Sequence, residues 1–211
     1  MIAKTSLFVK ICGMTRLQDA SHAVEQGANA LGFVFWPESP RYISPKRAFN
    51  IIKELPSDVG AVGVFVNETV KGIEQVAGES GVSTIQLHGD EPPAHAEELE
   101  WPVFRMTTVE RIEEVSHAWP AGTIFLMDAA DPLRRGGTGR TIDWQQAKSA
   151  ALAQRIILAG GLTPDNVADA VRTVRPFGVD VSSGVEDAPG VKNRDKVSRF
   201  LASARSIGDE G

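Results

Sequence analysis

The sequence of 211 residues has one cysteine, no run of basic residues and no apolar stretch longer than a few residues. A single cysteine cannot form an internal disulfide or supply a cysteine-rich zinc site. The 22 Lys and Arg are outnumbered by 27 Asp and Glu, and this net charge of −5 argues against nucleic-acid or membrane partners. The apolar stretches fall far short of the ~20 residues that span a bilayer. Lys10 also interrupts what would be the apolar core of a secretion signal, so we expect a cytoplasmic protein.

Eight short apolar runs are spread along the chain and predict eight β-strands. Their apolar residues are consecutive rather than alternating, as expected of parallel strands that are buried on both faces. The expected strands are Leu7–Cys12, Ala30–Phe35, Gly60–Val66, Val82–His88, Pro102–Met106, Thr123–Asp128, Arg155–Ala159 and Phe177–Ser182.

Helical patterns lie between these runs. Ser44 and Thr163 each precede a proline, a pairing typical of an N-cap followed by the first helical residue. Thr15 with Gln18 resembles a capping box, and Gly27 fits the end of the helix that would follow. The last helix is expected to bury a stripe of Val197, Phe200, Leu201 and Ala204, and weaker helical patterns cover 69–78, 91–100, 109–118 and 143–152.

Strands that alternate with helices pair in parallel through right-handed crossovers. Five or six such units would favour an open, doubly wound sheet, whereas eight favour closure into a (β/α)8 barrel. We therefore expect an α/β protein in which residues 1–211 form a single (β/α)8 TIM-barrel domain with mostly short loops.

The chemistry of such barrels takes place at the C-terminal ends of the strands and in the loops that follow. The polar or reactive residues at these places are Cys12, Arg41, His88, Asp128 and the segment 180–184. Cys12 ends the first strand, and Gly13 allows a backbone bend that would turn the thiol toward the barrel mouth. The alternative is that Cys12 is simply a small buried apolar side chain.

A carboxyl group, Asp128, ends the wholly apolar run 124–127. At the rim of an apolar pocket a carboxyl acquires a raised pKa and suits the work of a general acid. The alternative is an Asx turn that begins the following loop. His88 ends a similar run, where a bond to a neighbouring loop competes with a role in the site.

Two glycine-rich segments follow the seventh and eighth expected strands. The first contains Gly160 and Gly161, and the second contains Asp180, Ser182, Ser183 and Gly184. Glycines let backbone N–H groups approach an anion, and hydroxyl groups add further donors. The loops after strands seven and eight form the usual phosphate site of these barrels, so we expect a phosphorylated small-molecule ligand.

Two further loops are candidates for ligand contact. The longest, 129–141, is rich in glycine and suits a cover over the barrel mouth, although a solvated connection is the alternative. Arg41 lies in a proline-stiffened loop after the second strand, where it suits bidentate binding of a carboxylate, although an ordinary surface arginine is the alternative.

Together these residues resemble the phosphoribosylanthranilate isomerase family of tryptophan biosynthesis. The resemblance covers essentially the whole chain, and its motifs occur in order. They are Val9–Thr15, Gly32–Phe35, Ser39–Ile43, Gly63–Asn67, Gln86–Gly89, Gly136–Gly139 with Asp143–Trp144, Ala159–Leu162 and Asp180–Glu186.

The resemblance implies an Amadori rearrangement of N-(5-phospho-β-D-ribosyl)anthranilate to 1-(2-carboxyphenylamino)-1-deoxyribulose 5-phosphate. It makes Asp128 the general acid, Cys12 the general base and Arg41 the contact to the anthranilate carboxylate. It places His88 close to the site and assigns substrate binding to Gly160, Gly161, Asp180, Ser182, Ser183 and Gly184. An internal redox rearrangement needs only proton movement, so we expect no cofactor and no metal.

One segment departs from the family pattern. The loop after the sixth strand begins Asp128-Ala129-Ala130-Asp131, where family members often carry a hydroxyl or glycine and a lysine. Asp131 is therefore a second carboxylate near the expected acid, and Arg134, Arg135 and Arg140 are further candidates for ligand binding.

Two other functions remain as alternatives. One is another cofactor-free sugar-phosphate barrel, such as the aminoaldose–ketose isomerase of histidine biosynthesis, although those enzymes usually use two carboxylates and Cys12 argues against this. The other is a non-catalytic phosphate-ligand binding protein or thiol sensor, in which Asp128 would have no use. A monomer is expected because no exposed apolar helix face stands out, with a homodimer as the alternative.

Overall fold

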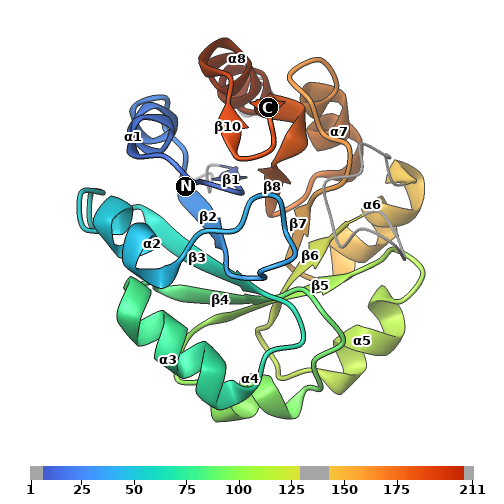
Figure 1. Cartoon of the computed structure of the whole chain (residues 1–211). Helices are drawn as coiled ribbons and strands as arrows, with labels where there is room; N and C mark the ends of the chain where they lie inside the picture. Colours follow the sequence, from blue (N-terminus) through green and yellow to red (C-terminus); the bar gives the residue numbers. More distant parts are fainter. Residues whose placement is uncertain (1–6, 129–142, 207–211) are drawn as a thin grey trace.

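The computed structural model describes residues 7–128 and 143–206, and eight parallel strands close into a barrel that the helices surround (Figure 1). The strands are β1 (Phe8–Ile11), β2 (Ala30–Val34), β3 (Gly60–Phe65), β4 (Thr84–Leu87), β5 (Val103–Thr107), β6 (Ile124–Met127), β7 (Ile156–Leu158) and β8 (Gly178–Val181). Each strand pairs with the next along the chain, and β8 pairs with β1 to complete the ring. The predicted (β/α)8 fold is confirmed.

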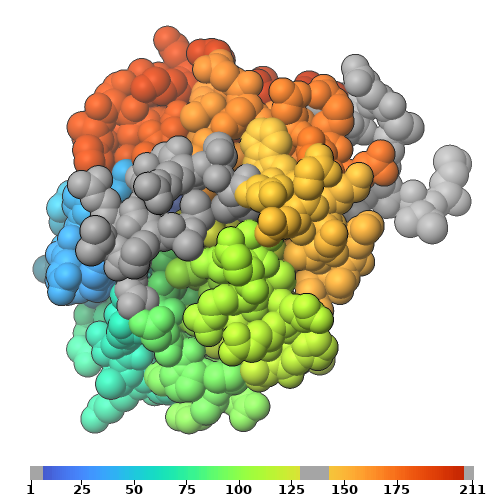
Figure 2. All heavy atoms as spheres, turned by 90° about the vertical axis from the view of Figure 1, so that its right-hand side faces the viewer, coloured from blue at the N-terminus to red at the C-terminus, as the bar shows by residue number. Residues whose placement is uncertain are grey.

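A helix follows each strand. The helices are α1 (Leu17–Glu25), α2 (Pro45–Ile52), α3 (Val70–Ser80), α4 (Ala94–Glu98), α5 (Ile112–Ala118), α6 (Trp144–Ala153), α7 (Val167–Val174) and α8 (Arg194–Arg205). Figure 2 shows the side of the molecule on which α5 and α6 lie at the surface. Within the described ranges, no helix combines the length and the apolar character needed to cross a bilayer.

Two predicted helix starts are wrong. The α7 helix begins at Val167 and not at Pro164, because the side chain of Asn166 accepts the Thr163 N–H at 2.8 Å and holds a separate turn. Thr15 does not cap α1, because its hydroxyl donates to the carbonyl of Gly190 at 2.5 Å. Arg16 is the N-cap of α1 instead, and its side chain makes no capping hydrogen bond.

Other predicted helix signals are confirmed. Ser44 is the N-cap of α2 with Pro45 as the first helical residue, although its side chain makes no capping hydrogen bond. Gly27 follows α1 with a φ of +93°, a conformation that glycine adopts without strain. The stripe predicted for α8 is fully buried.

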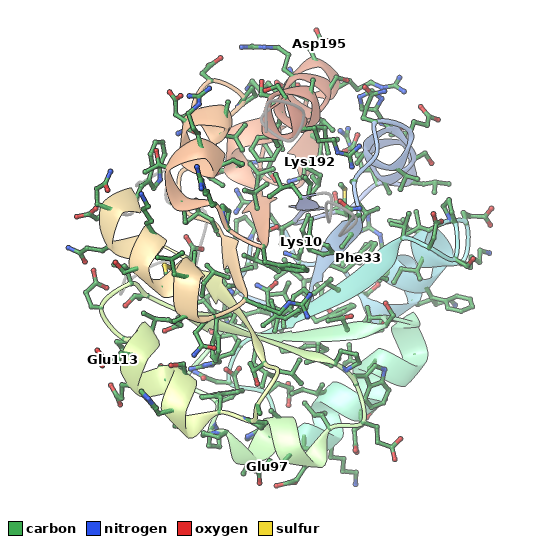
Figure 3. All side chains as sticks on the ribbon, turned by 180° about the vertical axis from the view of Figure 1, so that it is seen from behind. Lys10, Phe33, Glu97, Glu113, Lys192 and Asp195 are labelled. Atoms are coloured by element: carbon green, nitrogen blue, oxygen red, sulfur yellow. The ribbon has the colours of Figure 1, made fainter. Side chains whose placement is uncertain are left out.

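Side chains along each strand alternate between the barrel interior and the face that the helices cover. Ile11 and Phe33 belong to the larger core between the strands and the helices. The interior has its own smaller apolar cluster, formed by Ala30, Val62, Phe104, Leu126, Ile157 and Ala159. Lys10 is wholly buried at an inward position of β1, and Figure 3 shows it at the centre of the molecule, whereas Glu97, Glu113 and Asp195 lie at the periphery.

One element was not anticipated. After β8 the chain forms a short 3₁₀ turn, η1 (Ser183–Val185), and then an antiparallel hairpin of β9 (Glu186–Ala188) and β10 (Val191–Lys192). This hairpin lies between β8 and α8 in the chain. It brings the charged side chains of Glu186 and Lys192 to the end of the barrel where the strands finish. The predicted cover loop 129–141, with Asp131 and its arginines, lies outside the described residues.

Candidate active site

Four polar side chains directly follow the C-terminal ends of barrel strands. Cys12, His88, Asp128 and Ser182 come after β1, β4, β6 and β8, each at the position where alternation directs the side chain inward. Cys12, His88 and Asp128 are each less than a tenth exposed. The expected acid and base therefore line the same end of the barrel, on strands that lie across the ring from one another.

The Cys12 thiol lies against the backbone of β2. A Cβ atom added to Gly32 would come within 2.6 Å of the sulfur, so only glycine leaves room for the thiol at this place. Burial raises the pKa of the Cys12 thiol above its ordinary value, since a thiolate loses hydration there. The nearby Lys10 ammonium opposes this rise, and the Asp180 carboxylate adds to it.

A buried ion pair between β1 and β8 lies in the barrel interior, and its lysine is two residues before Cys12. The Lys10 ammonium contacts the Asp180 carboxylate at 2.9 Å, and the lysine side chain is wholly inaccessible to solvent. Burial is the largest single influence and would lower the pKa of Lys10, but the attraction and hydrogen bonds of Asp180 and Cys12 together outweigh it, so the net pKa is raised. Lys10 therefore supplies a permanent positive charge beside the thiol. The contribution of Asp180 to substrate binding stays a prediction.

His88 lies between a buried amide and the predicted acid. Gln86 Nε2 is 2.8 Å from His88 Nδ1, and His88 Nε2 is 4.0 Å from the Asp128 carboxylate. When the amide donates to Nδ1, the proton of a neutral imidazole is on Nε2. That tautomer directs an N–H group toward Asp128, which favours the charged carboxylate that remains after proton donation.

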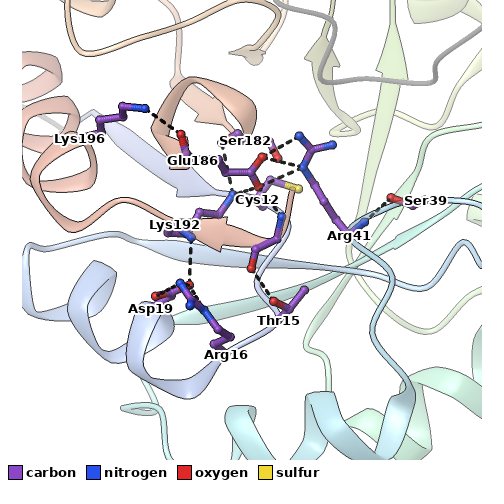
Figure 4. A network of polar contacts seen from close by, with 11 residues as sticks. Cys12, Thr15, Arg16, Asp19, Ser39, Arg41, Ser182, Glu186, Lys192 and Lys196 are labelled. Carbon is purple, nitrogen blue, oxygen red and sulfur yellow. Dashed lines mark hydrogen bonds and ion pairs between the residues drawn. The ribbon is translucent and has the colours of Figure 1, made fainter. Parts of the chain in front are cut away.

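Arg41 reaches the site from the loop between β2 and α2. Its Nε and terminal nitrogen contact both carboxylate oxygens of Glu186 at 2.7 to 3.1 Å (Figure 4). Gly13, with a φ of +79°, lies so close that a Cβ there would be 2.7 Å from Arg41 Cδ and 3.1 Å from Ser182 Oγ. The loops after β1, β2 and β8 therefore meet at one glycine.

The two glycine-rich segments also contact each other. Gly160 and Gly161 both adopt positive φ, at 78° and 65°. Ser183 and Gly184 belong to η1, where a Cβ on Gly184 would collide with the carbonyl oxygen of Leu162. The buried hydroxyl of Ser182 has no hydrogen-bond partner in the described structure, so it has an unused donor beside these loops. Their binding of phosphate stays a prediction.

Three charged residues of this region were missed as site residues. Lys10 carried a usable signal, because a lysine inside an otherwise apolar strand must find a buried partner. Glu186 and Lys192 flank Pro189-Gly190, a dipeptide that predicts a turn and hence a hairpin, but no local pattern shows that both side chains turn inward. Among the described residues, no three His, Cys, Asp or Glu side chains are grouped closely enough to hold a metal ion.

Comparison with known proteins identifies the family. The family model for N-(5′-phosphoribosyl)anthranilate isomerase matches residues 9–203. The enzyme of that name from Trichlorobacter lovleyi is 49% identical over 201 residues, which cover 93% of this chain and 97% of the relative.

Similar solved structures belong to the same family. A phosphoribosyl anthranilate isomerase in complex with reduced 1-(o-carboxyphenylamino)-1-deoxyribulose 5-phosphate is 41% identical, with a TM-score of 0.85, and the match covers 95% of this chain and 99% of the other. Engineered monomers of the dimeric enzyme from Thermotoga maritima are 38% identical, with the same TM-score and coverage. This chain belongs to the N-(5′-phosphoribosyl)anthranilate isomerase family.

Proposed function

We propose that Cys12 and Asp128 are the base and the acid of the family's reaction in this chain. The protein is an isomerase of tryptophan biosynthesis that rearranges N-(5′-phosphoribosyl)anthranilate to 1-(2-carboxyphenylamino)-1-deoxyribulose 5-phosphate. The observation that supports the assignment is the placement of one thiol and one carboxyl across the same end of the barrel, after β1 and β6.

The first step needs an acid. Asp128 donates a proton to the furanose ring oxygen while the bond from that oxygen to C1′ breaks, and the nitrogen lone pair forms the C=N bond of a protonated Schiff base. Only a protonated carboxyl can do this, and Asp128 is the carboxyl group that directly follows β6 at this end of the barrel. The His88 imidazole at 4.0 Å is placed to stabilise the carboxylate that results.

The second step needs a base. The Cys12 thiolate removes the proton from C2′, and the electrons of that C–H bond move to neutralise the iminium and give an enolamine. Tautomerisation of the enolamine yields the ketone. Because the thiol is buried, its thiolate depends on the neighbouring Lys10 charge, which lies inside a low-dielectric barrel and is correspondingly effective.

Arg41 and the two glycine-rich loops bind the ends of the substrate in this proposal. Arg41 contacts the anthranilate carboxylate through the nitrogen edge that Glu186 leaves open, since Glu186 takes Nε and one terminal nitrogen. Gly160, Gly161, Ser182, Ser183 and Gly184 bind the phosphate with backbone N–H groups and hydroxyls. The ligand of the related complex carries both a carboxyphenyl group and a 5-phosphate, which supports these two ends.

The alternatives are not supported by the relatives. The similar enzymes and structures described above carry the name of this isomerase and not that of a histidine-pathway isomerase, a phosphate-ligand binding protein or a thiol sensor. A cytoplasmic location is inferred from the biosynthetic role. The expected monomer stays a prediction, which sedimentation equilibrium tests, because the Thermotoga maritima relative is described as dimeric.

The assignment is tested by rescue of a tryptophan auxotroph that lacks this isomerase. The wild-type chain is expected to restore growth without tryptophan, and Cys12→Ala and Asp128→Ala are not. Growth with either variant at wild-type rate, at matched expression, would remove that residue from the proposed acid–base pair.

A further inference from the structure

The Glu186 carboxylate is the centre of a buried charge cluster. Its side chain is 4% exposed and receives hydrogen bonds from Arg41, from Lys192 Nζ at 2.7 Å and from the Gly190 N–H at 3.1 Å. Burial alone would raise the pKa of Glu186, but the bonds from Arg41 and Lys192 outweigh it and hold the pKa below its ordinary value. Glu186 is therefore a carboxylate at neutral pH.

Lys192 connects this carboxylate to the ends of two barrel strands. Its Nζ donates to the carbonyl oxygen of Cys12 at 2.5 Å and to that of Ser182 at 3.3 Å, in addition to Glu186 (Figure 4). These carbonyls belong to the proposed base and to the start of the proposed phosphate loop. The Lys192 side chain is 1% exposed, so the contacts are shielded from water.

The hairpin that carries both residues is itself fixed to the barrel. The Lys192 N–H donates to Asp19 of α1 at 3.0 Å, and the Gly190 carbonyl accepts from Thr15 at 2.5 Å. Lys196 of α8 donates to the carbonyl of Glu186 at 2.8 Å. The backbone of the hairpin is thus held at three places, which fixes the position from which the Glu186 side chain extends.

We propose that Glu186 is a positioning residue that sets the guanidinium of Arg41 for the substrate carboxylate and, through Lys192, sets the backbone at Cys12. This inference rests on the proposed function, because it concerns the same two groups. Glu186 occupies one edge of the planar guanidinium, so the other edge is presented in one orientation. A charge-assisted bond from Lys192 to the Cys12 carbonyl restrains the backbone of the residue that carries the thiol.

Charge and geometry make opposite predictions for the loss of Glu186. Arg41 and Lys192 with Glu186 carry a net charge of +1, from two cations and one carboxylate. Glu186→Gln removes the negative charge of this cluster, so a purely electrostatic role predicts tighter binding of a substrate that carries a phosphate and a carboxylate, and a lower KM. A positioning role predicts the reverse, because the guanidinium and the ammonium lose their shared anchor.

The experiment measures kcat and KM for Glu186→Gln and for Asp187→Asn, a control that removes an exposed carboxylate from the next residue of β9. We expect Glu186→Gln to raise KM and lower kcat by about tenfold or more each, as for the loss of charge-assisted hydrogen bonds. Asp187→Asn should leave both unchanged. An unchanged or lower KM in Glu186→Gln, or an equal effect of Asp187→Asn, would overturn the proposal.

Two further variants keep the test decisive. Glu186→Asp retains the charge but is one methylene too short to contact both cations. It should therefore raise KM and lower kcat by smaller factors, and it tests the proposal even if Glu186→Gln does not fold. In a double-mutant cycle, Arg41→Ala should abolish the KM effect of Glu186→Gln but not its kcat effect. If Arg41→Ala alone leaves KM unchanged, the carboxylate contact of the proposed function is wrong. If Arg41→Ala raises KM but Glu186→Gln does not, only the positioning role is wrong.

Discussion

Lys10 of the first barrel strand and Asp180 of the last form an ion pair of 2.9 Å that is almost wholly buried. The two residues are aligned in the parallel register of β1 and β8, so the pair also closes the ring. Its charges have lost most of their hydration, and each depends on the other for compensation. The pair therefore bears on both the stability of the barrel and the ionisation of Cys12.

Removal of one partner should destabilise the protein strongly. We expect Lys10→Met to lower the free energy of unfolding by about 3–5 kcal/mol, the usual cost of leaving a buried charge unpaired. Lys10→Met/Asp180→Asn, which removes both charges at nearly unchanged volume, should recover much of that loss. Urea unfolding followed by circular dichroism measures all three proteins. A double variant as unstable as the single one would mean that packing, and not charge, dominates at this place.

The reactivity of Cys12 should depend on pH in a way that reflects its burial. Because burial raises the thiol pKa, the alkylation rate with iodoacetamide should have its midpoint above the ordinary value of 9.0. The thiolate fraction then increases with pH through that midpoint. Lys10→Met should move the midpoint higher, since the ammonium is the main group that lowers it. The urea-unfolded chain serves as control, and a folded midpoint below the unfolded one would contradict the assignment.

Loss of either proton-transfer group should abolish most turnover without loss of the fold. General acid–base groups contribute about 10²- to 10⁴-fold, and we expect kcat of Cys12→Ala and of Asp128→Ala to fall within or beyond that range. Circular dichroism and binding of the reduced product analogue serve as controls, because neither substitution removes a predicted phosphate or carboxylate contact. Full retention of kcat in one variant would show that another group moves that proton.

Arg41→Ala should weaken binding more than it slows the chemistry. The loss of a hydrogen bond to a charged group is worth about 1.5–3 kcal/mol, which corresponds to roughly a 10- to 150-fold increase in KM. Lys46→Ala removes an exposed cation from the neighbouring helix and is the matched control. Steady-state kinetics with both variants distinguishes a contact to the anthranilate carboxylate from a general attraction of anions, which would affect both variants alike.

The strands were predictable because parallel strands buried on both faces leave consecutive apolar residues in the sequence. Each of the eight predicted runs contains the observed strand within one or two residues at either end, apart from β5, which extends one residue further. The residues after these strands were predictable for the same reason, since a polar group that ends an apolar run must lie at the rim. Cys12, His88 and Asp128 were found in this way.

The buried ion pairs Arg41–Glu186 and Lys10–Asp180 were not predictable from local patterns. Arg41 and Glu186 are 145 residues apart, and Lys10 and Asp180 are 170 apart, so their pairing depends on closure of the ring. Thr163 shows the same difficulty for a helix start, because its N–H is taken by Asn166 in a turn that local propensity does not reveal. The two ion pairs depend on contacts distant in the sequence, whereas the start of α7 depends on a turn whose ends are only three residues apart.

The pairing of β1 with β8 has a consequence for the nascent chain during its synthesis. Lys10 leaves the ribosome well before Asp180, because 170 residues separate the two, and Glu186 and Lys192 follow later still. Until then Cys12 has neither a finished wall of strands nor the hairpin that holds its backbone. The Cys12 thiol therefore reaches its final surroundings only after β8 and the hairpin have been synthesised.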